Sequence, residues 1–301
     1  MYRDAGNLLG EANCLWELSR IRDIVGDHSA AGELLEQGLQ LYRKVGDRLG
    51  QANVFHALCR LRSMHGDFPA AADLERRASQ LYREAGNRIG VANSLSELGR
   101  LSYATGDYPQ ASDLLERSLK LYRDLGNRLG EANNLHMLGR TRGRAGDYAA
   151  ATGLLEQALD LYLDIGGRNG QAYSFHELGR IRYLTGDYPA AAGLLERAMS
   201  LFRDLGDLSG QAEALNSTGD LLAECSELLE ALAVHQQALE LACRAQNPLE
   251  EARALEGTAR RQLAIGDRQA ALAGLRDAVA VYQRINPAQA LLTAEYLSSL
   301  E

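Results

Sequence analysis

The chain has 301 residues, of which 46% are hydrophobic and 24% charged, and its formal net charge is −8. This composition is typical of a folded chain, and the acidic balance argues against nonspecific nucleic-acid binding. No apolar stretch reaches the ~20 residues of a membrane span, and the first residues lack the apolar core of a signal peptide. We therefore expect a cytoplasmic protein. The four cysteines form no CxxC pair and are interpreted as small buried thiols: Cys14, Cys59, Cys225 and Cys243.

The sequence repeats itself every 40 residues, without insertions over most of its length. Periods of this kind are typical of solenoids, in which each unit packs on its neighbours. Glycine stands at 6, 46, 86, 126, 166 and 206, and alanine at 12, 52, 92, 132, 172, 212 and 252. We expect one solenoid domain over 1–301, with units at 7–46, 47–86, 87–126, 127–166, 167–206, 207–246 and 247–286 and a capping helix at 287–300.

The chain begins inside a unit. Residues 1–6 (Met-Tyr-Arg-Asp-Ala-Gly) match residues 121–126 (Leu-Tyr-Arg-Asp-Leu-Gly), which end the second helix of the third unit. We therefore expect a fragment of a longer protein, the alternative being a reading frame that starts too late.

The unit 87–126 predicts two antiparallel helices of about 18 residues, each ~27 Å long. Asn87 is a suitable N-cap for the first helix, and Gly106 supplies the left-handed residue that ends it. Asp107 caps the second helix, which ends at Gly126. The apolar residues of the first helix fall at steps of three on one stripe: Ala92, Leu95, Leu98 and Leu101.

Small residues recur where the helices are expected to cross. Gly, Ala or Ser occupies positions 38, 78, 118, 158, 198, 238 and 278, and Gly occupies 99, 139, 179 and 219. A glycine inside a helix costs about 1 kcal/mol relative to alanine, so its recurrence predicts backbones that approach too closely for a side chain. Because no single pair can bury its apolar stripe, we expect an all-α, right-handed α-solenoid of antiparallel helix pairs.

One recurrent pattern resembles the tetratricopeptide repeat: Leu95…Leu98-Gly99…Gly106-Asp107-Tyr108…Ala111…Ser118. The usual repeat has 34 residues, so 40-residue units imply longer helices. The tryptophan of the family is Leu or Phe here, and its first-helix tyrosine is Ser102 or Arg142. The resemblance covers nearly all of the chain and implies the solenoid fold, but it specifies no chemistry.

The pattern decays toward the C-terminus. In the sixth unit Ser226-Glu227 replaces the Gly-Asp of the turn, so we expect this unit to lose it. Position 246 is Gln instead of Gly, whereas the seventh unit recovers Gly266-Asp267. Terminal units of a solenoid are atypical because their outer face meets water, which fits a final amphipathic helix at 287–300.

Two segments resemble bacterial regulators. Residues 121–133 (Leu-Tyr-Arg-Asp-Leu-Gly-Asn-Arg-Leu-Gly-Glu-Ala-Asn) are similar to the C-terminal repeat arrays of STAND-type NTPase regulators, and 254–284 resembles the last repeats of SARP-type antibiotic regulators. In those families the array follows DNA-binding and nucleotide-binding domains and is thought to sense or hold a partner. The resemblance implies a sensor role, with a nucleotide-binding domain of the same longer chain as one partner. The chain itself contains no Gly-x-x-x-x-Gly-Lys-Ser/Thr phosphate loop.

The first helices of a helix-pair solenoid line its concave face. On that face helical spacing predicts three ladders, that is, rows of one residue type that recur at the same position of successive units. The asparagine ladder is Asn13, Asn53, Asn93 and Asn133, the arginine ladder is Arg20, Arg60, Arg100, Arg140 and Arg180, and the histidine ladder is His56, His136 and His176. Trp16 and Ser96 occupy the histidine position in two other units. Asn amides suit the main chain of an extended peptide, and Arg suits carboxylates. We expect a groove for an extended or helical peptide of acidic character, similar to the groove of Pins/LGN-type adaptors.

Alternatives to this interpretation stay open. Glu17, Glu97 and Glu177 each precede an arginine of the ladder by three residues. In the alternative interpretation these pairs simply neutralise each other on a solvated face. One histidine per unit places neighbours roughly 10 Å apart, too far to share a zinc ion, so we expect no metal and no cofactor. Polar residues recur by register instead of converging in one pocket. We therefore expect a noncatalytic module, either the sensor of a regulator or a free-standing scaffold adaptor.

Overall fold

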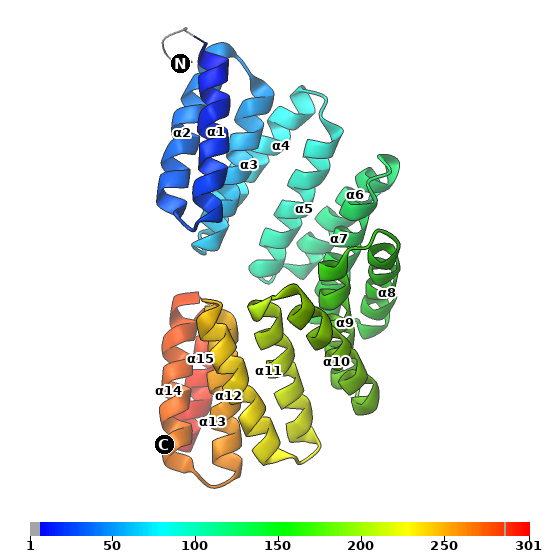
Figure 1. Ribbon diagram of the computed structural model, residues 1–301, viewed down its shortest axis with the longest axis vertical. Coiled ribbons are helices and arrows are strands. Elements are labelled where there is room, and N and C mark those ends of the chain that lie inside the picture. The colour runs from blue at the N-terminus through cyan, green and yellow to red at the C-terminus, as the bar shows by residue number, and fades with distance from the viewer. Residues whose placement is uncertain (1–6, 286) are drawn as a thin grey trace. The chain divides into compact units, whose positions relative to one another are not determined.

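The computed structural model describes residues 7–285 and 287–301. All regular secondary structure in these residues is α-helical, which confirms the predicted fold class (Figure 1). The fifteen described helices are α1 Leu8–Ile24, α2 His28–Val45, α3 Arg48–Met64, α4 Phe68–Glu84, α5 Arg88–Ala104, α6 Tyr108–Asp124, α7 Arg128–Arg144, α8 Tyr148–Asp164, α9 Arg168–Leu184, α10 Tyr188–Leu205, α11 Leu208–Glu224, α12 Leu228–Arg244, α13 Pro248–Ala264, α14 Arg268–Ile285 and α15 Pro287–Leu300. The prediction that the chain starts in the middle of a unit concerns residues 1–6, which lie outside the described residues.

The helices fall into two compact units, 1–147 and 148–301. The first unit contains α1 to α7 and the second α8 to α15. Along the chain from α1 to α14, odd-numbered helices begin the 40-residue repeats and even-numbered helices complete them, as Figure 1 shows for α1 and α2 or for α13 and α14. The predicted capping helix is present as α15, which packs on α14.

Capping residues place the helix ends at the predicted positions. The side chain of Asn87 accepts a hydrogen bond of 2.9 Å from the backbone N–H of Gly90, and Asp107 does the same for Gln110 at 3.0 Å. Each bond satisfies one of the N–H groups that have no partner in the first helical turn. Both helices of this repeat, α5 and α6, have 17 residues, in agreement with the expected length.

The turn of the sixth repeat is kept, which corrects the expectation that Ser226-Glu227 would abolish it. Ser226 adopts the left-handed conformation with φ 67°, where the other repeats have glycine. Gln246 does the same at the end of α12, with φ 52°. Non-glycine residues pay a steric cost of about 1–2 kcal/mol in this conformation. The local turn geometry therefore persists because the packing of the flanking helices imposes it.

Replacing Gln246 by glycine should therefore stabilise the protein by about 1 kcal/mol, because glycine removes the left-handed strain at an exposed position. Thermal and urea unfolding would measure the change. The matched control is Ala245→Gly, one residue earlier, where φ is −78° and glycine should destabilise by a similar amount. A free energy of unfolding that changes in the same direction in both variants would contradict the assignment of strain to position 246.

Two of the glycines inside the helices, Gly99 and Gly179, lie at helix crossings, where a leucine side chain of the second helix fills the space beside them instead of the closely approaching backbone that the pattern predicted. A Cβ at Gly99 would lie 2.7 Å from Leu115, and one at Gly179 would lie 3.0 Å from Leu195. The glycine near the start of the first helix has a related role in five repeats, which the sequence pattern did not reveal: Gly50, Gly90, Gly130, Gly170 and Gly210. At Gly130 a Cβ would lie 2.4 Å from the ring of Tyr122, which comes from the preceding helix. The close approach of Tyr122 to Gly130 joins one repeat to the next, whereas those at Gly99 and Gly179 lie within a repeat.

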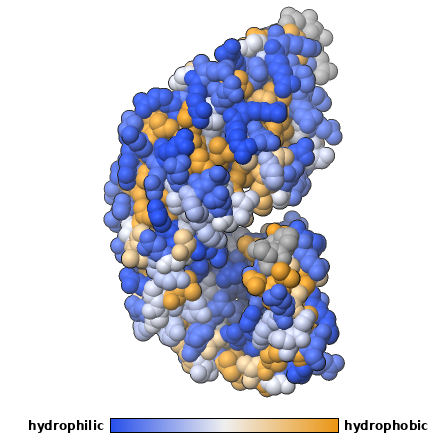
Figure 2. Space-filling model, turned by 180° about the vertical axis from the view of Figure 1, so that it is seen from behind, coloured by the Kyte–Doolittle hydropathy of each residue, from blue (hydrophilic) through white to orange (hydrophobic). Residues whose placement is uncertain are grey.

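The face drawn in Figure 2 shows hydrophilic residues over both units, interrupted by apolar patches. None of the described helices is both long and apolar enough to cross a membrane.

The prediction of four buried thiols was wrong for three of them. Cys59 is fully buried, and burial raises the pKa of its thiol. Cys14, Cys225 and Cys243 are exposed, and all four are free. Small size does not force burial on an amphipathic helix, because position on the helix decides which residues face the core.

Candidate functional site

The predicted asparagines lie on the first helices of their repeats, and three of them accept hydrogen bonds from tyrosines of the second helices. The hydroxyls of Tyr42, Tyr82 and Tyr122 donate to the Oδ1 atoms of Asn13, Asn53 and Asn93 at 2.7, 2.7 and 2.6 Å. Each tyrosine comes from the second helix of the same repeat. Asn133 is exposed at the same register on α7. These bonds occupy the carboxamide oxygen and leave the NH2 group as the donor for a ligand.

The predicted arginines lie on the same helices, and most are paired with acids. Arg20, Arg100 and Arg180 bond to Glu17, Glu97 and Glu177 three residues earlier, at 3.0, 3.1 and 3.0 Å. Arg60 reaches Asp23 of α1 at 3.0 Å, and Arg140 lies over the ring of Tyr103 at 5.3 Å. The Glu–Arg pairs expected from the solvated-face alternative are therefore formed. Only the Arg20–Glu17 pair is exposed on both sides, and an exposed pair contributes little stability, so it leaves the guanidinium group of Arg20 available to a ligand.

The predicted histidines have different surroundings from one repeat to the next. His56 on α3 binds the carboxylate of Glu75 on α4, with 3.0 Å from Nδ1 to each oxygen. Burial opposes the charged ring, but the hydrogen bond and the charge of Glu75 outweigh it and raise the pKa of His56 above 6.5. His136 is half-buried on α7. His176 on α9 is fully buried, with Nε2 at 2.9 Å from Ser217 Oγ of α11.

In the first unit, a cavity of about 130 Å³ brings three of the predicted residues together. Arg20 of α1 and His56 and Arg60 of α3 line it with Trp16, while α2 contributes apolar side chains such as Leu35. Trp16 also packs against the core of the first repeats. The cavity therefore combines an aromatic wall with two guanidinium groups, which suits a side chain carrying both apolar and acidic groups.

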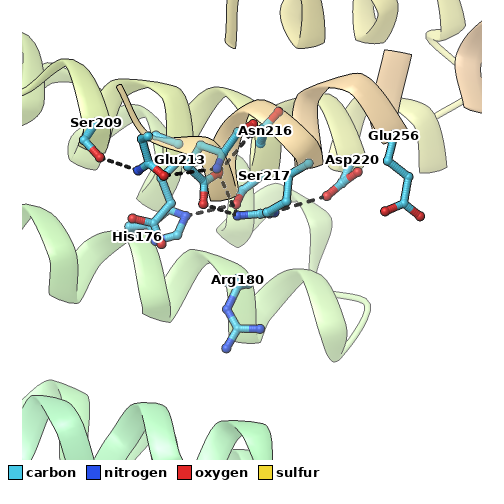
Figure 3. Close-up of polar contacts among 12 residues, drawn as sticks. His176, Arg180, Ser209, Glu213, Asn216, Ser217, Asp220 and Glu256 are labelled. Carbon is cyan, nitrogen blue, oxygen red and sulfur yellow. Dashed lines mark hydrogen bonds and ion pairs between the residues drawn. The ribbon is translucent and has the colours of Figure 1, made fainter. Parts of the chain in front are cut away.

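In the second unit, a polar network links α9, α11 and α13 (Figure 3). The amide of buried Asn216 donates to the main-chain oxygen of Glu250 at 3.0 Å and to its Oε2 at 2.9 Å. Arg253 bonds to the same carboxylate at 3.0 Å and lies 3.9 Å from Asp220. At the other end Asn247 donates to Ser209 at 2.6 Å. Buried polar groups of this kind are stable only because they are paired.

His235 of α12 packs against this network. Its ring is 1% exposed, and Nδ1 lies 3.2 Å from Oδ1 of Asn216. The ring fills space left by two glycines, since a Cβ at Gly219 or Gly257 would lie 2.7 or 2.4 Å from it. Burial, assisted by the positive charges of Arg261 and Arg253, lowers the pKa of His235 to about 4.

Sequence reasoning missed two of the most unusual residues, Glu75 and His235. Both occupy the repeat position that is a fully buried leucine elsewhere, at Leu35, Leu115, Leu155, Leu195 and Leu275. A break in this leucine register was visible in the sequence and is the signal that would have found them. Each is compensated locally, Glu75 by His56 and His235 by Asn216 with the two glycines.

Comparisons with known proteins agree with this architecture. Two family models described as tetratricopeptide repeat match the sequence, one over residues 4–84 and 90–164 and the other over 174–209. No curated protein gives a significant sequence match.

Solved structures share the fold at low sequence identity. Aspartyl phosphate phosphatase F from Bacillus subtilis has a TM-score of 0.75 at 15% identity, covering 92% of this chain and 71% of its own. The Rap conjugation gene regulator of plasmid pLS20, in complex with the Phr* peptide, has a TM-score of 0.73 at 14% identity, covering 95% and 78%. A STAND protein with a tetratricopeptide repeat sensor from Pyrococcus horikoshii has a TM-score of 0.67 at 15% identity, covering 96% of this chain and 44% of its own.

Proposed function

The chain belongs to the tetratricopeptide repeat family, and from this premise we propose that it is a noncatalytic module that binds a peptide or protein along the first helices of its repeats. The observation that carries the proposal is the cavity on α1 and α3, where Trp16, Arg20, His56 and Arg60 meet. An aromatic wall beside guanidinium groups is suited to anchoring one side chain of a bound peptide.

The comparisons support a regulatory role within this proposal. One structural neighbour is a regulator in complex with a peptide, and another carries its repeats as the sensor of a STAND protein. We infer that this chain serves as the sensor or partner-binding part of a bacterial regulator in the cytoplasm. A nucleotide-binding domain of the same longer protein is the partner that the sensor would restrain or release. Ligand binding would act by favouring one of these two states.

The ligand chemistry follows from the ladder of arginines. Arg20, Arg60 and Arg100 keep more than half of their side chains exposed, at 59%, 55% and 62%. At Arg20 the acid partner Glu17 is itself 61% exposed, so a ligand carboxylate can displace it at low cost, because exposed pairs are worth only about 0–1 kcal/mol. We propose an acidic peptide, with the NH2 groups of the asparagine ladder donating to its main chain.

Peptide selection from a random display library on the purified chain tests the proposal. Selected peptides should be enriched in Asp and Glu. Arg20→Glu and Arg60→Glu should each weaken their binding by about tenfold or more, because reversal of one contacting charge is worth at least ~1.4 kcal/mol. Fluorescence anisotropy of labelled peptides would measure the affinities at two salt concentrations.

The matched control is Arg76→Glu on the second helix α4. Arg76 is 64% exposed and bonds to Asp73 three residues earlier, as Arg20 bonds to Glu17. Its replacement should change affinity less than twofold. An equal loss in this control would place binding on the second helices, and a library that yields no saturable binder would overturn peptide binding altogether.

A further inference from the structure

A second cluster lies on α9 and α11 of the second unit, outside the cavity described above. His176, Glu177 and Glu213 bring one ligand atom each to within 4.8 Å of one another. Their side chains are 1%, 5% and 22% exposed, so two of them are buried and the third opens toward solvent. Figure 3 shows His176 on one helix and Glu213 on the neighbouring one, close together.

The surroundings of His176 leave one ring nitrogen unsatisfied. Nε2 lies 2.9 Å from Ser217 Oγ, within hydrogen-bond distance, whereas buried Nδ1 has no hydrogen-bond partner. Nδ1 faces Oε1 of Glu213 at 3.7 Å, which is longer than a hydrogen bond. When Nε2 carries the proton and donates it to Ser217, Nδ1 presents a lone pair toward a carboxylate oxygen.

The distance between Nδ1 of His176 and Oε1 of Glu213 is one that two ligands of the same cation can have. Metal bonds to nitrogen and oxygen are ~2.0–2.1 Å long. At a tetrahedral angle two such ligand atoms lie about 3.3 Å apart, and at wider angles their separation reaches up to about 4.2 Å. The 3.7 Å between Nδ1 and Oε1 falls in this interval. A cation between them would satisfy the buried nitrogen and remove the repulsion between the two lone pairs.

The charges around the cluster also favour a cation. Glu177 bonds to Arg180 at 3.0 Å, and Glu250 bonds to Arg253 at 3.0 Å, so each of these pairs is close to neutral. Glu213 adds one further negative charge beside the ring of His176. A carboxylate has two oxygens, so the bond from Arg180 to Oε2 of Glu177 is compatible with metal ligation by the same group.

We propose that His176, Glu177 and Glu213 bind one first-row divalent cation of the zinc or manganese class, joining α9 to α11. Imidazole nitrogen among the ligands disfavours Mg²⁺ and Ca²⁺, which prefer oxygen. Ser217 is the outer partner that fixes the tautomer and orientation of the ring. Three protein ligands leave a further coordination position that a water molecule can fill.

The repeat provides internal controls for this assignment. At the positions that correspond to Glu177 and Glu213, the repeat of His56 has Ala57 and Asn93, and the repeat of His136 has Met137 and Tyr173. A histidine thus occurs at this register three times, but two carboxylates join it only at His176. The proposed site therefore differs from one ion shared between ladder histidines, which their spacing excludes.

Titration of the whole chain with ZnCl₂ or MnCl₂ after treatment with a chelator tests the proposal by calorimetry. One equivalent should bind per chain, and the Co²⁺ form should show a visible spectrum typical of nitrogen and oxygen ligands. Glu213→Gln keeps the shape of a partly exposed side chain and should abolish this binding. Ser217→Ala should weaken it by about 10–100-fold, as loss of an outer hydrogen-bond partner does.

His136→Gln is the matched control and should bind the ion as the unmodified chain does. An ion held elsewhere, for example at the neighbouring rings of His28 and His65, would bind the unmodified chain and Glu213→Gln equally. That result, or the lack of saturable binding by the unmodified chain, would overturn the proposal. Because the probe is the metal alone, the outcome is independent of peptide binding.

Discussion

Replacement of His56 by alanine is expected to destabilise the protein by about 3–5 kcal/mol, because it leaves a buried carboxylate without its partner. Glu75 is 0% exposed, and both of its oxygens lie 3.0 Å from Nδ1 of His56. An ionised carboxylate without a partner in the core costs far more than a lost methylene group. Urea unfolding at pH 7 would measure the change in free energy.

The matched variant is Glu75→Leu, which restores the residue found at this position in most repeats. Replacing a buried ionic pair by a well-packed apolar residue is often neutral, or stabilising by about 1–4 kcal/mol. In the Glu75→Leu background, the His56→Ala change should lose most of its effect. If it destabilises the Glu75→Leu protein as much as the original one, the pair is not the cause.

The His56–Glu75 pair also sets a direction for the pH dependence. The pKa of His56 is raised in the folded state, so the protonated ring contributes stability that is fully present below the unfolded pKa of about 6.5. This contribution is lost as pH rises through the folded pKa. Glu75→Leu should remove it.

Acidification from pH 7 to pH 4 is expected to remove about 3 kcal/mol of stability through His235 alone. Its pKa is lowered to about 4 in the folded protein, whereas an unfolded histidine has a pKa of about 6.5 and binds its proton earlier. A group whose folded pKa is depressed stabilises the fold above the unfolded pKa, and the stability falls as pH drops toward the folded pKa. The buried ring beside Arg253 and Arg261 is the physical cause.

Thermal unfolding between pH 7 and pH 4 of the unmodified chain and of His235→Leu measures this contribution. Leucine should fit, because Leu115 and Leu195 occupy the same position against Gly99 and Gly179. Groups far from His235, such as His56, are the same in both proteins, so their effects cancel in the comparison. Asp220, whose Oδ1 lies 3.6 Å from Nε2 of His235, belongs to the contribution that is measured. The two stability curves should diverge below pH 6.5, and parallel curves would contradict the role assigned to His235.

The helix pairs and most of their ends follow from local sequence. Asn87 and Asp107 each cap a helix through a bond to the residue three positions later. Such a bond involves only local sequence, so the sequence predicts it. The recurrence of glycine at 99 and 179 likewise indicated close helix crossings. Such features depend on contacts of short range, which a single repeat already encodes.

Other features depend on neighbouring helices. The turn at Ser226 survives without glycine because α11 and α12 hold it in place. Asn13, predicted as a peptide contact, is also the acceptor for Tyr42, and no pattern within α1 reveals that bond.

The sequence by itself determined the repeat and most helix boundaries, because these depend on periodicity and capping. Only the tertiary structure decided which ladder members meet. Arg20, His56 and Arg60 share a cavity, whereas His176 is buried against Glu213 and Ser217. The physical reason is that repeats with the same register differ in what the adjacent helix presents, and the pairing of buried charges depends on those differences.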